Sequence, residues 1–221
     1  MHTHVHSQES PAQTEGRLIR WASFYDATVD LMTLGHAGLL RNITVDRALL
    51  QPGESILDVG CGTGGVTLPA KVRVGEKGIA AGIDPAPEMI AVAHRKAERA
   101  GLEIDFRVGV IEALPFADRT FDVVTSSLMM HHLSRQLQVK GLAEILRVLK
   151  PGGRVFIADM LRPSESRFKR FLTSMVFHHG HLVDSGLEDL LQLLRGAGFE
   201  GVEQLNERFL VIGFVRAKKP A

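Results

Sequence analysis

Short apolar runs alternate with amphipathic stretches along most of this chain. Runs rich in valine, isoleucine and other apolar residues are typical of strands, and they occur at 55–59, 77–84, 103–108, 121–127 and 154–160. Apolar residues at three- and four-residue steps predict helices at 17–50, 85–101, 134–153 and 185–199. Two final strand-like runs, 201–205 and 209–217, predict a hairpin that turns at the polar segment 206–208.

The order of these elements predicts the fold class. Strands that alternate with helices form a parallel, doubly wound sheet with helices on both faces. The two successive strands at the C-terminal end depart from that alternation and predict an antiparallel edge strand. We therefore expect an α/β protein with a mostly parallel, seven-stranded, Rossmann-like sheet and an N-terminal helical cap.

The length and composition suit one globular domain. The chain has 221 residues, and 45% of them are hydrophobic, which is enough for a full core. Residues 1–16 are polar and predict a disordered tail. We expect residues 17–45 to form a helical cap over the active site and residues 46–221 to form the domain that contains the sheet.

Charge and cysteine content narrow the functional classes. The formal net charge of +1 gives no sign of a nucleic-acid partner. Cys61 is the one cysteine, which excludes a disulfide within the chain and fits a reducing compartment. No apolar run approaches the roughly 18 residues that cross a membrane, and the first residues lack the pattern of a secretory signal. We therefore expect a cytoplasmic protein.

A glycine-rich segment, DVGCGTGG at 58–65, follows the first predicted strand. Gly60, Gly62 and Gly65 satisfy the G-x-G-x-x-G pattern of NAD-binding Rossmann domains. In a doubly wound sheet this turn is the usual ligand cradle, and its glycines let the backbone approach the ligand closely. Asp84, at the end of the second strand, is suited to bind two ribose hydroxyls. These features fit NAD and other adenosine-containing cofactors equally well.

Asp58, two residues before Gly60, decides between these cofactors. A carboxylate in a poorly solvated site would repel the pyrophosphate of a dinucleotide by several kcal/mol. S-adenosylmethionine (SAM) carries no phosphate, and its ammonium and sulfonium groups are attracted by a carboxylate, directly or through water. The motif is then D-x-G-x-G-x-G, completed by Gly62 and Gly64, and the predicted cofactor is SAM.

Four segments in this order resemble the motifs of the class I SAM-dependent methyltransferases. They span about residues 54–160 and are ILDVGCGTGG, GIDPAPEMI, EALPFADRTFDVV and RVLKPGGRVFIAD. Within that family, the segment FYDATVDLMTLGHAGLLRN resembles the N-terminal part of the ubiquinone/menaquinone-biosynthesis C-methyltransferases and their small-molecule and lipid relatives. The resemblance implies methyl transfer from SAM.

The resemblance also implies roles for individual residues. Asp58 and Gly60 would hold the methionine end of SAM, and the backbone carbonyl of Ser127 would accept from its ammonium group. Tyr25 would close over SAM near its carboxylate or sulfonium, where a π-face suits a cation; a role in anchoring the cap is the alternative. Pro85 and Met89 would line the adenine, although Met89 also fits core packing. The full set of expected cofactor contacts is Tyr25, Asp58, Gly60, Cys61, Gly62, Asp84, Pro85, Met89, Val110, Ile111 and Ser127.

Two positions depart from the pattern of the quinone enzymes. Those enzymes usually have Asp or another polar residue where this chain has Val110, so one hydrogen bond to the adenine amino group is missing. The predicted cost in affinity is about 1 kcal/mol. Adenine must then rely on apolar contacts and on backbone groups around Val110 and Ile111. His131 and His132 stand where the quinone enzymes have an Arg-Asn pair, which argues against a quinone substrate but not against methyl transfer.

The histidine pair follows the fourth strand at the predicted active edge of the sheet. A histidine titrates near neutral pH and can accept a proton from an incoming nucleophile. We expect His131 to be the catalytic base, together with Tyr25 as the second catalytic residue, and His132 to be structural. A later cluster lacks the spacing of a zinc site, so no metal is expected; it comprises His178, His179 and His181.

We therefore expect a SAM-dependent methyltransferase that moves the methyl group to a small-molecule or lipid-like acceptor by in-line displacement. Two alternatives remain open: a non-catalytic SAM-binding regulatory module and, with less support, an NAD-dependent oxidoreductase. Residues 162–172 combine basic residues with phenylalanines, which fits either a peripheral membrane contact or a solvated helix face. The sequence predicts neither the acceptor atom nor the oligomeric state.

Overall fold

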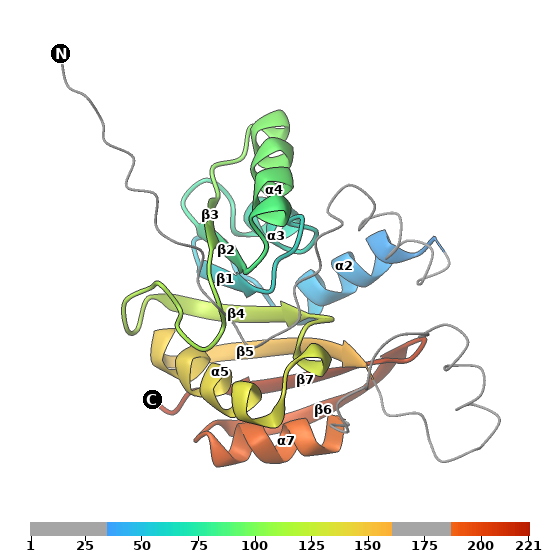
Figure 1. Ribbon diagram of the computed structural model, residues 1–221, viewed down its shortest axis with the longest axis vertical. Helices are drawn as coiled ribbons and strands as arrows, with labels where there is room; N and C mark the ends of the chain where they lie inside the picture. The colour runs from blue at the N-terminus through green and yellow to red at the C-terminus, as the bar shows by residue number, and fades with distance from the viewer. Residues whose placement is uncertain (1–34, 161–186) are drawn as a thin grey trace.

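The computed structural model describes residues 35–160 and 187–221, which form a sheet covered by helices on both faces (Figure 1). The sheet has seven strands in the order β3-β2-β1-β4-β5-β7-β6. In chain order the strands are β1 (Ser55–Val59), β2 (Ile79–Asp84), β3 (Asp105–Val108), β4 (Phe121–Ser127), β5 (Leu149–Met160), β6 (Glu200–Phe209) and β7 (Ile212–Lys218).

The described helices are α2 (Ala37–Arg47), α3 (Thr67–Val74), α4 (Pro87–Ala100), α5 (Arg135–Val148) and α7 (Leu187–Gly196), with a 3₁₀ turn at Met130–His132. Most of them lie between strands, but α2 precedes β1, no helix separates β3 from β4, and α3 occupies a segment for which the sequence predicts no helix. Within the two described ranges, no helix is long and apolar enough to cross a membrane. The predicted tail and the first half of the predicted cap lie outside the described residues.

Strand direction confirms the expected fold class. The strands from β3 to β5 pair in parallel, and β7 pairs antiparallel with β5 on one side and β6 on the other. The antiparallel strand therefore lies one place inside the edge, because the hairpin adds β6 on its outer side. The hairpin turns at Leu210 and Val211 rather than at 206–208, since β6 continues as a strand through Phe209.

The boundary between α5 and β5 differs from the prediction. The helix begins where expected, and the hydroxyl of Ser134 accepts from the N–H of Leu137 at 3.4 Å. It ends at Val148 rather than at residue 153, and Leu149 already belongs to β5. Pro151 explains the early end, because it has no N–H to donate and its ring clashes with a preceding helical turn.

The core has two halves, one on each face of the sheet. Alternate residues of a strand point to opposite faces, so neighbours in β1 contribute to different halves. Ile56 belongs to the half that includes α2 and α3, whereas Leu57 belongs to the half that includes α5 and α7. Both side chains are fully buried. Figure 1 shows α5 and α7 next to each other on one side of the sheet.

The strand order positions the functional site. From β1 the chain moves outward through β2 and β3, and it then returns to place β4 on the other side of β1. This reversal creates a crevice between β1 and β4 beyond their carboxyl ends, where ligands bind in doubly wound sheets. The crevice lies at Val59 and Ser127, the last residues of these two strands.

Candidate functional site

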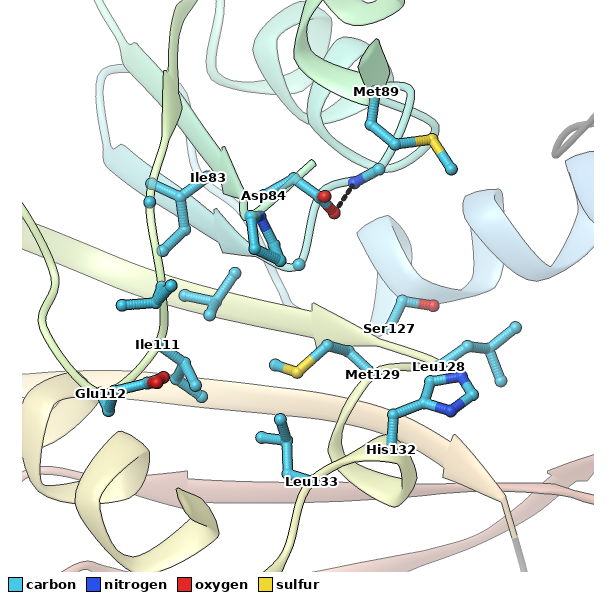
Figure 2. Close-up of a pocket in the computed structure, with 16 residues that line it drawn as sticks. Ile83, Asp84, Met89, Ile111, Glu112, Ser127, Leu128, Met129, His132 and Leu133 are labelled. Atoms are coloured by element: carbon cyan, nitrogen blue, oxygen red, sulfur yellow. Dashed lines mark hydrogen bonds between the residues drawn. The ribbon is translucent and has the colours of Figure 1, made fainter. Parts of the chain in front are cut away.

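A cavity of about 750 Å³ opens at this crevice, and we call it the first cavity (Figure 2). Its walls come from the ends of β1 and β2 and from the segments that follow β3 and β4. The residues that line it are Val59, Gly60, Gly62, Ile83, Asp84, Pro85, Met89, Gly109, Val110, Ile111, Glu112, Ser127, Leu128, Met129, His132 and Leu133. A mostly apolar lining with a few polar groups is typical of small-molecule sites.

The loop after β1 presents main chain to the first cavity. Gly60, Gly62 and Gly64 have φ values of +74°, +52° and +80°, in the left-handed region that favours glycine. The N–H groups of Gly60 and Cys61 donate to the carbonyl of Ile83 at 2.9 and 2.8 Å. These two hydrogen bonds hold the loop against the end of β2, so its backbone forms a fixed wall for a ligand.

Asp84 lies at the end of β2 and faces the first cavity. One carboxylate oxygen accepts from the N–H of Gly62 at 3.0 Å, shown in Figure 2, and the other accepts from the N–H of Ala86 at 2.9 Å. Burial raises the pKa of Asp84 above its ordinary value, and the two backbone hydrogen bonds oppose that rise. The carboxylate is thereby fixed in orientation, as binding two ribose hydroxyls requires.

Asp58 is buried beneath the loop, with a residue exposure of 1%. Its two oxygens accept from the hydroxyls of Thr67 at 2.7 Å and Thr125 at 2.9 Å. Burial raises the pKa of Asp58 to about 6, although both hydroxyls oppose the rise. Asp58 lines a separate cavity beside Gly60 rather than the first cavity. A carboxylate that is costly to ionise is typical of functional sites.

The ionisation of Asp58 should make the stability of the protein depend on pH. The pKa of Asp58 is higher in the folded than in the unfolded protein, so protonated Asp58 favours the folded state. This contribution to stability is fully present below about pH 4 and is lost as the pH rises through about 6. Asp58→Asn mimics the protonated form. It should change the free energy of unfolding by under about 1 kcal/mol at pH 4 and raise it by about 3 kcal/mol at pH 7. Urea unfolding measures both values, and an equal difference at the two pH values would contradict the prediction.

Apolar side chains form the wall of the first cavity opposite the glycine loop. Pro85 and Met89 follow β2, and Val110 and Ile111 follow β3. Met89 is 2% exposed, so it contributes to the core as well as to the cavity wall. Glu112 also lines this wall, which the sequence did not indicate. A planar nucleobase could therefore make apolar contacts with this wall and hydrogen bonds with its main-chain groups.

The segment that follows this wall is held by Arg147 of α5. The guanidinium donates to the carbonyls of Leu114 and Phe116 at 3.0 and 2.8 Å, and to the carboxylates of Glu144 and Asp118 at 2.8 and 2.7 Å. Glu144 also accepts from the N–H of Leu114 at 2.8 Å. The hydrogen bond from Arg147 holds the pKa of Glu144 below its ordinary value. This network fixes the path of the loop beside the cavity.

Cys61 lies inside the glycine loop and is buried. Burial, with the nearby carboxylates of Asp58 and Asp84, raises the pKa of its thiol well above the ordinary value. A thiol in that state is a poor nucleophile at neutral pH, because the thiolate is the reactive form. Its sulfur also lies 3.0 Å from the position that a Cβ at Gly82 would occupy. Cys61 therefore acts as a small packing residue.

The histidine pair is arranged in the reverse of the expected order. His132 lines the first cavity, whereas His131 lies outside it and pairs with Asp159. The Nδ1 of His131 lies 2.5 Å from a carboxylate oxygen of Asp159, and its main-chain N–H donates to the other oxygen at 3.1 Å. The two rings are in contact, with centroids 3.9 Å apart and their planes tilted by 43°. The 3₁₀ turn at Met130–His132 directs the consecutive side chains to different sides.

Several expected residues fall outside the described ranges. Tyr25 is one of them, and so are the basic segment 162–172 and the later histidines. Within residues 35–160 and 187–221 no cluster of three or more metal-ligating side chains occurs. The sequence also missed lining residues that a strand end places beside predicted ones. Each of them lies close in the chain to Ser127 or Ile111, and that proximity could have indicated them. These residues are Glu112, Leu128, Met129, His132 and Leu133.

Comparison with known proteins indicates the family and the fold. Residues 56–153 match the methyltransferase domain family. The chain is 28% identical over 220 residues to the ubiquinone/menaquinone biosynthesis C-methyltransferase UbiE of Klebsiella pneumoniae, covering 90% of this chain and 87% of that protein. The matched domain, the relatives and the fold are those of class I SAM-dependent methyltransferases. These findings support a SAM-dependent methyltransferase with SAM, rather than NAD, as its cofactor.

Solved structures agree with this assignment. A SAM-dependent methyltransferase from Aquifex aeolicus aligns with a TM-score of 0.67 and 25% identity, covering 81% of this chain and 89% of that chain. The [4+2]-cyclase SpnF aligns with the same TM-score and the same identity, and the alignment covers 83% of this chain and 81% of the SpnF chain. Because a cyclase shares the fold, the fold alone does not name the reaction. The assignment of methyl transfer rests on the domain family and the methyltransferase relatives.

The residues of the site fit the chemistry of SAM. Asp84 can accept from both ribose hydroxyls, and the wall at Val110 and Ile111 can contact the adenine. Two buried carboxylates, Asp58 and Asp84, favour a cationic ligand over a pyrophosphate, because like charges repel strongly at low effective dielectric. SAM combines an adenosine with a sulfonium and an ammonium group, so it satisfies each of these features.

Proposed function

We propose that this methyltransferase acts on a small, largely apolar acceptor whose nucleophilic atom carries a proton. The proposal rests on the lining of the first cavity beyond Ser127, where Leu128, Met129 and Leu133 surround one titratable group, His132. Apolar side chains exclude water and favour an apolar or lipid-like acceptor, and a single basic group suits removal of one proton.

The position of the reacting methyl group follows from the two ends of the cofactor. With the ribose at Asp84 and the methionine end at Gly60 and Ser127, the sulfur lies between them. Met129, which follows β4, is the side chain nearest to Gly60 of the glycine loop. A Cβ at Gly60 would lie 2.5 Å from the Cγ of Met129. The acceptor would then approach from the side of Met129 and His132.

Most of the catalytic effect would come from positioning. SAM supplies a methyl group that its sulfonium has already activated. The glycine loop and Asp84 orient the cofactor, and the apolar wall aligns the acceptor so that nucleophile, methyl carbon and sulfur lie in line; such alignment accounts for about 7–11 kcal/mol of a barrier. The nucleophile would give an electron pair to the methyl carbon as the bond from that carbon to sulfur breaks, and His132 would take the proton that the nucleophile releases on a ring nitrogen.

The relatives support a small acceptor. The Klebsiella pneumoniae protein is named for ubiquinone and menaquinone biosynthesis and for methylation at carbon. An acceptor of that kind would be apolar and would need to lose a proton, as the cavity lining favours. His132 and His131 differ from the Arg-Asn pair expected of the quinone enzymes, so we propose the chemical class and not the quinone itself.

Transfer of labelled methyl groups tests this proposal. The full chain would be incubated with [methyl-¹⁴C]SAM and a cell extract separated into organic-soluble and aqueous small molecules. The proposal predicts that the label appears in the organic-soluble fraction and depends on active protein. Label confined to the aqueous fraction, to protein or to nucleic acid would contradict an apolar acceptor.

His132→Ala should lower kcat by about 100-fold, because it removes the one basic side chain in the acceptor part of the first cavity. The dissociation constant for SAM should change less than threefold, since the cofactor contacts remain. His131→Ala is the comparison, and it should lower kcat less than tenfold by removing the ring that contacts His132. Single-turnover rates and calorimetry separate the two effects. The opposite ranking of the variants would assign the base to His131.

A further inference from the structure

A buried carboxylate holds the histidine pair from outside the first cavity. Asp159 lies near the end of β5, beside the 3₁₀ turn at Met130–His132, and is 3% exposed. It lines a small cavity of about 240 Å³, together with Met130, His131, Gln138, Met160, Leu187 and Leu190. None of these residues lines the first cavity. A ligand in the first cavity is therefore out of contact with Asp159.

The Asp159 carboxylate binds His131 at two points. One oxygen accepts from the main-chain N–H of His131 at 3.1 Å, and the other lies 2.5 Å from its ring Nδ1. The second oxygen also accepts from the main-chain N–H of Met160 at 2.7 Å, which fixes the carboxylate itself. Because an ionised carboxylate only accepts hydrogen bonds, the pairing assigns a ring proton of His131 to Nδ1.

The main chain of the turn is also held from α5. Gln138 is 2% exposed, and its side-chain amide donates to the carbonyl of Met130 at 2.8 Å. Gln138 and Asp159 therefore bind the main chain of the turn at consecutive residues, and they come from two different elements. Because the path of the main chain is fixed in this way, a change in the His131 ring would reach the next residue through its side chain.

His132 is the side chain that this arrangement supports. Its ring contacts the ring of His131, with the centroids 3.9 Å apart. The side chains of His131 and Asp159 are only 13% and 5% exposed, and their hydrogen bond prevents the His131 ring from turning. The ring of His132 thus lies against a fixed ring on one side and lines the first cavity.

We propose that Asp159 is a positioning residue for methyl transfer, which fixes the ring of His131 and thereby orients the ring of His132 toward the acceptor. The inference rests on the proposed function, in which His132 takes the proton of the acceptor. Asp159 touches neither acceptor nor cofactor in this account, and its effect on the reaction passes through His131.

Asp159→Asn tests the proposal, because it removes the charge and keeps the shape of the side chain. The rate of label transfer from [methyl-¹⁴C]SAM to the organic-soluble fraction of the cell extract should fall about three- to tenfold, since a misdirected base costs less than a missing one. The dissociation constant for SAM should change less than twofold. Asp46→Asn is the matched control; Asp46 lies on α2 and pairs with Arg73, so both quantities should stay unchanged.

The spectra of the histidine rings give a readout that does not depend on activity. Two-dimensional ¹H–¹⁵N spectra of the full chain should show a proton on Nδ1 of His131. In Asp159→Asn the amide can donate to Nδ1, so that nitrogen should lose its proton, and the ring signals of His132 should shift. Ring signals of His132 that stay the same in Asp159→Asn would contradict the proposed coupling.

Double variants identify the route of the effect. In a His131→Ala background, Asp159→Asn should lower the rate no further, because the ring through which it acts is missing. Additive losses would overturn the proposal, as would a full rate in Asp159→Asn. A full rate in His132→Ala would instead contradict the proposed function on which the inference rests, so the two failures are distinguishable.

His131→Phe provides a second, independent variant. It keeps a ring against His132 but lacks the nitrogen that Asp159 holds, so the rate should fall to about the level of Asp159→Asn. A full rate would show that contact with any ring is enough, and it would overturn the role of Asp159. Thermal unfolding without ligand confirms that each variant is folded.

Discussion

Replacing Asp84 with alanine should weaken SAM binding by about 100-fold or more. The carboxylate faces the first cavity, and each hydrogen bond from a ribose hydroxyl to a charged group contributes about 1.5–3 kcal/mol. The variant also loses the acceptor for the N–H of Gly62, so the glycine loop becomes less fixed. Isothermal titration with SAM and with S-adenosylhomocysteine measures the loss for both forms of the cofactor.

Asp46→Ala is the control for this measurement. Asp46 lies on α2, its side chain is 58% exposed, and it pairs with Arg73 away from the first cavity and from the cavity that Asp58 lines. Its removal should leave the affinity for SAM unchanged. An Asp84 variant that binds SAM as tightly as the unaltered protein would contradict the ribose assignment.

Replacing Gly60 with alanine should nearly abolish cofactor binding. The φ of +74° disfavours any residue with a Cβ, and that Cβ would lie 2.5 Å from the Cγ of Met129. Met129 would have to move, and the first cavity and the cavity that Asp58 lines meet at Gly60, so the side chains would occupy the space that the sulfur needs. We expect at least a 100-fold loss of SAM affinity and a loss of stability of about 1–3 kcal/mol.

Gly101→Ala separates strain from crowding. Gly101 ends α4 with a φ of +64°, and a Cβ there would meet nothing within 4 Å. This control carries the backbone strain without the crowding, so it should lower the melting temperature less than Gly60→Ala and leave SAM binding intact. If both variants bound SAM equally well, the glycine loop would not form the wall of the cofactor site.

The sequence predicts the sheet well because its signals are local. Each strand in the parallel part has an apolar run of its own, and the helices α4, α5 and α7 have periodic apolar faces, so most of the element order follows directly. The short helix α3 lacks such a signal, and the sequence does not predict it. The errors arise where a tertiary contact or a single residue decides. Pro151 moves the start of β5 into the predicted helix, and the pairing of β6 with β7 moves the hairpin turn to Leu210.

The sequence likewise predicts those residues of the site that local signals position, and misses those that depend on turns or tertiary contacts. Asp84 ends β2, and Pro85 and Val110 lie within two residues of a strand end, so their place at the carboxyl edge of the sheet follows from the fold. The structure brings all three together in one cavity. The directions in which the His131 and His132 side chains point depend on a 3₁₀ turn that the sequence does not predict. The side chain of Arg41, on α2, lies beside Gly65, and no local pattern links such distant positions.

The structure of the protein in complex with S-adenosylhomocysteine tests the account most directly. The account predicts the ribose hydroxyls within hydrogen-bond distance of the Asp84 carboxylate and the adenine against Pro85 and Val110. It also predicts the sulfur between Gly60 and Met129, with its free side toward His132. A ligand that binds with its ribose away from Asp84, or with its sulfur turned away from His132, would contradict the account.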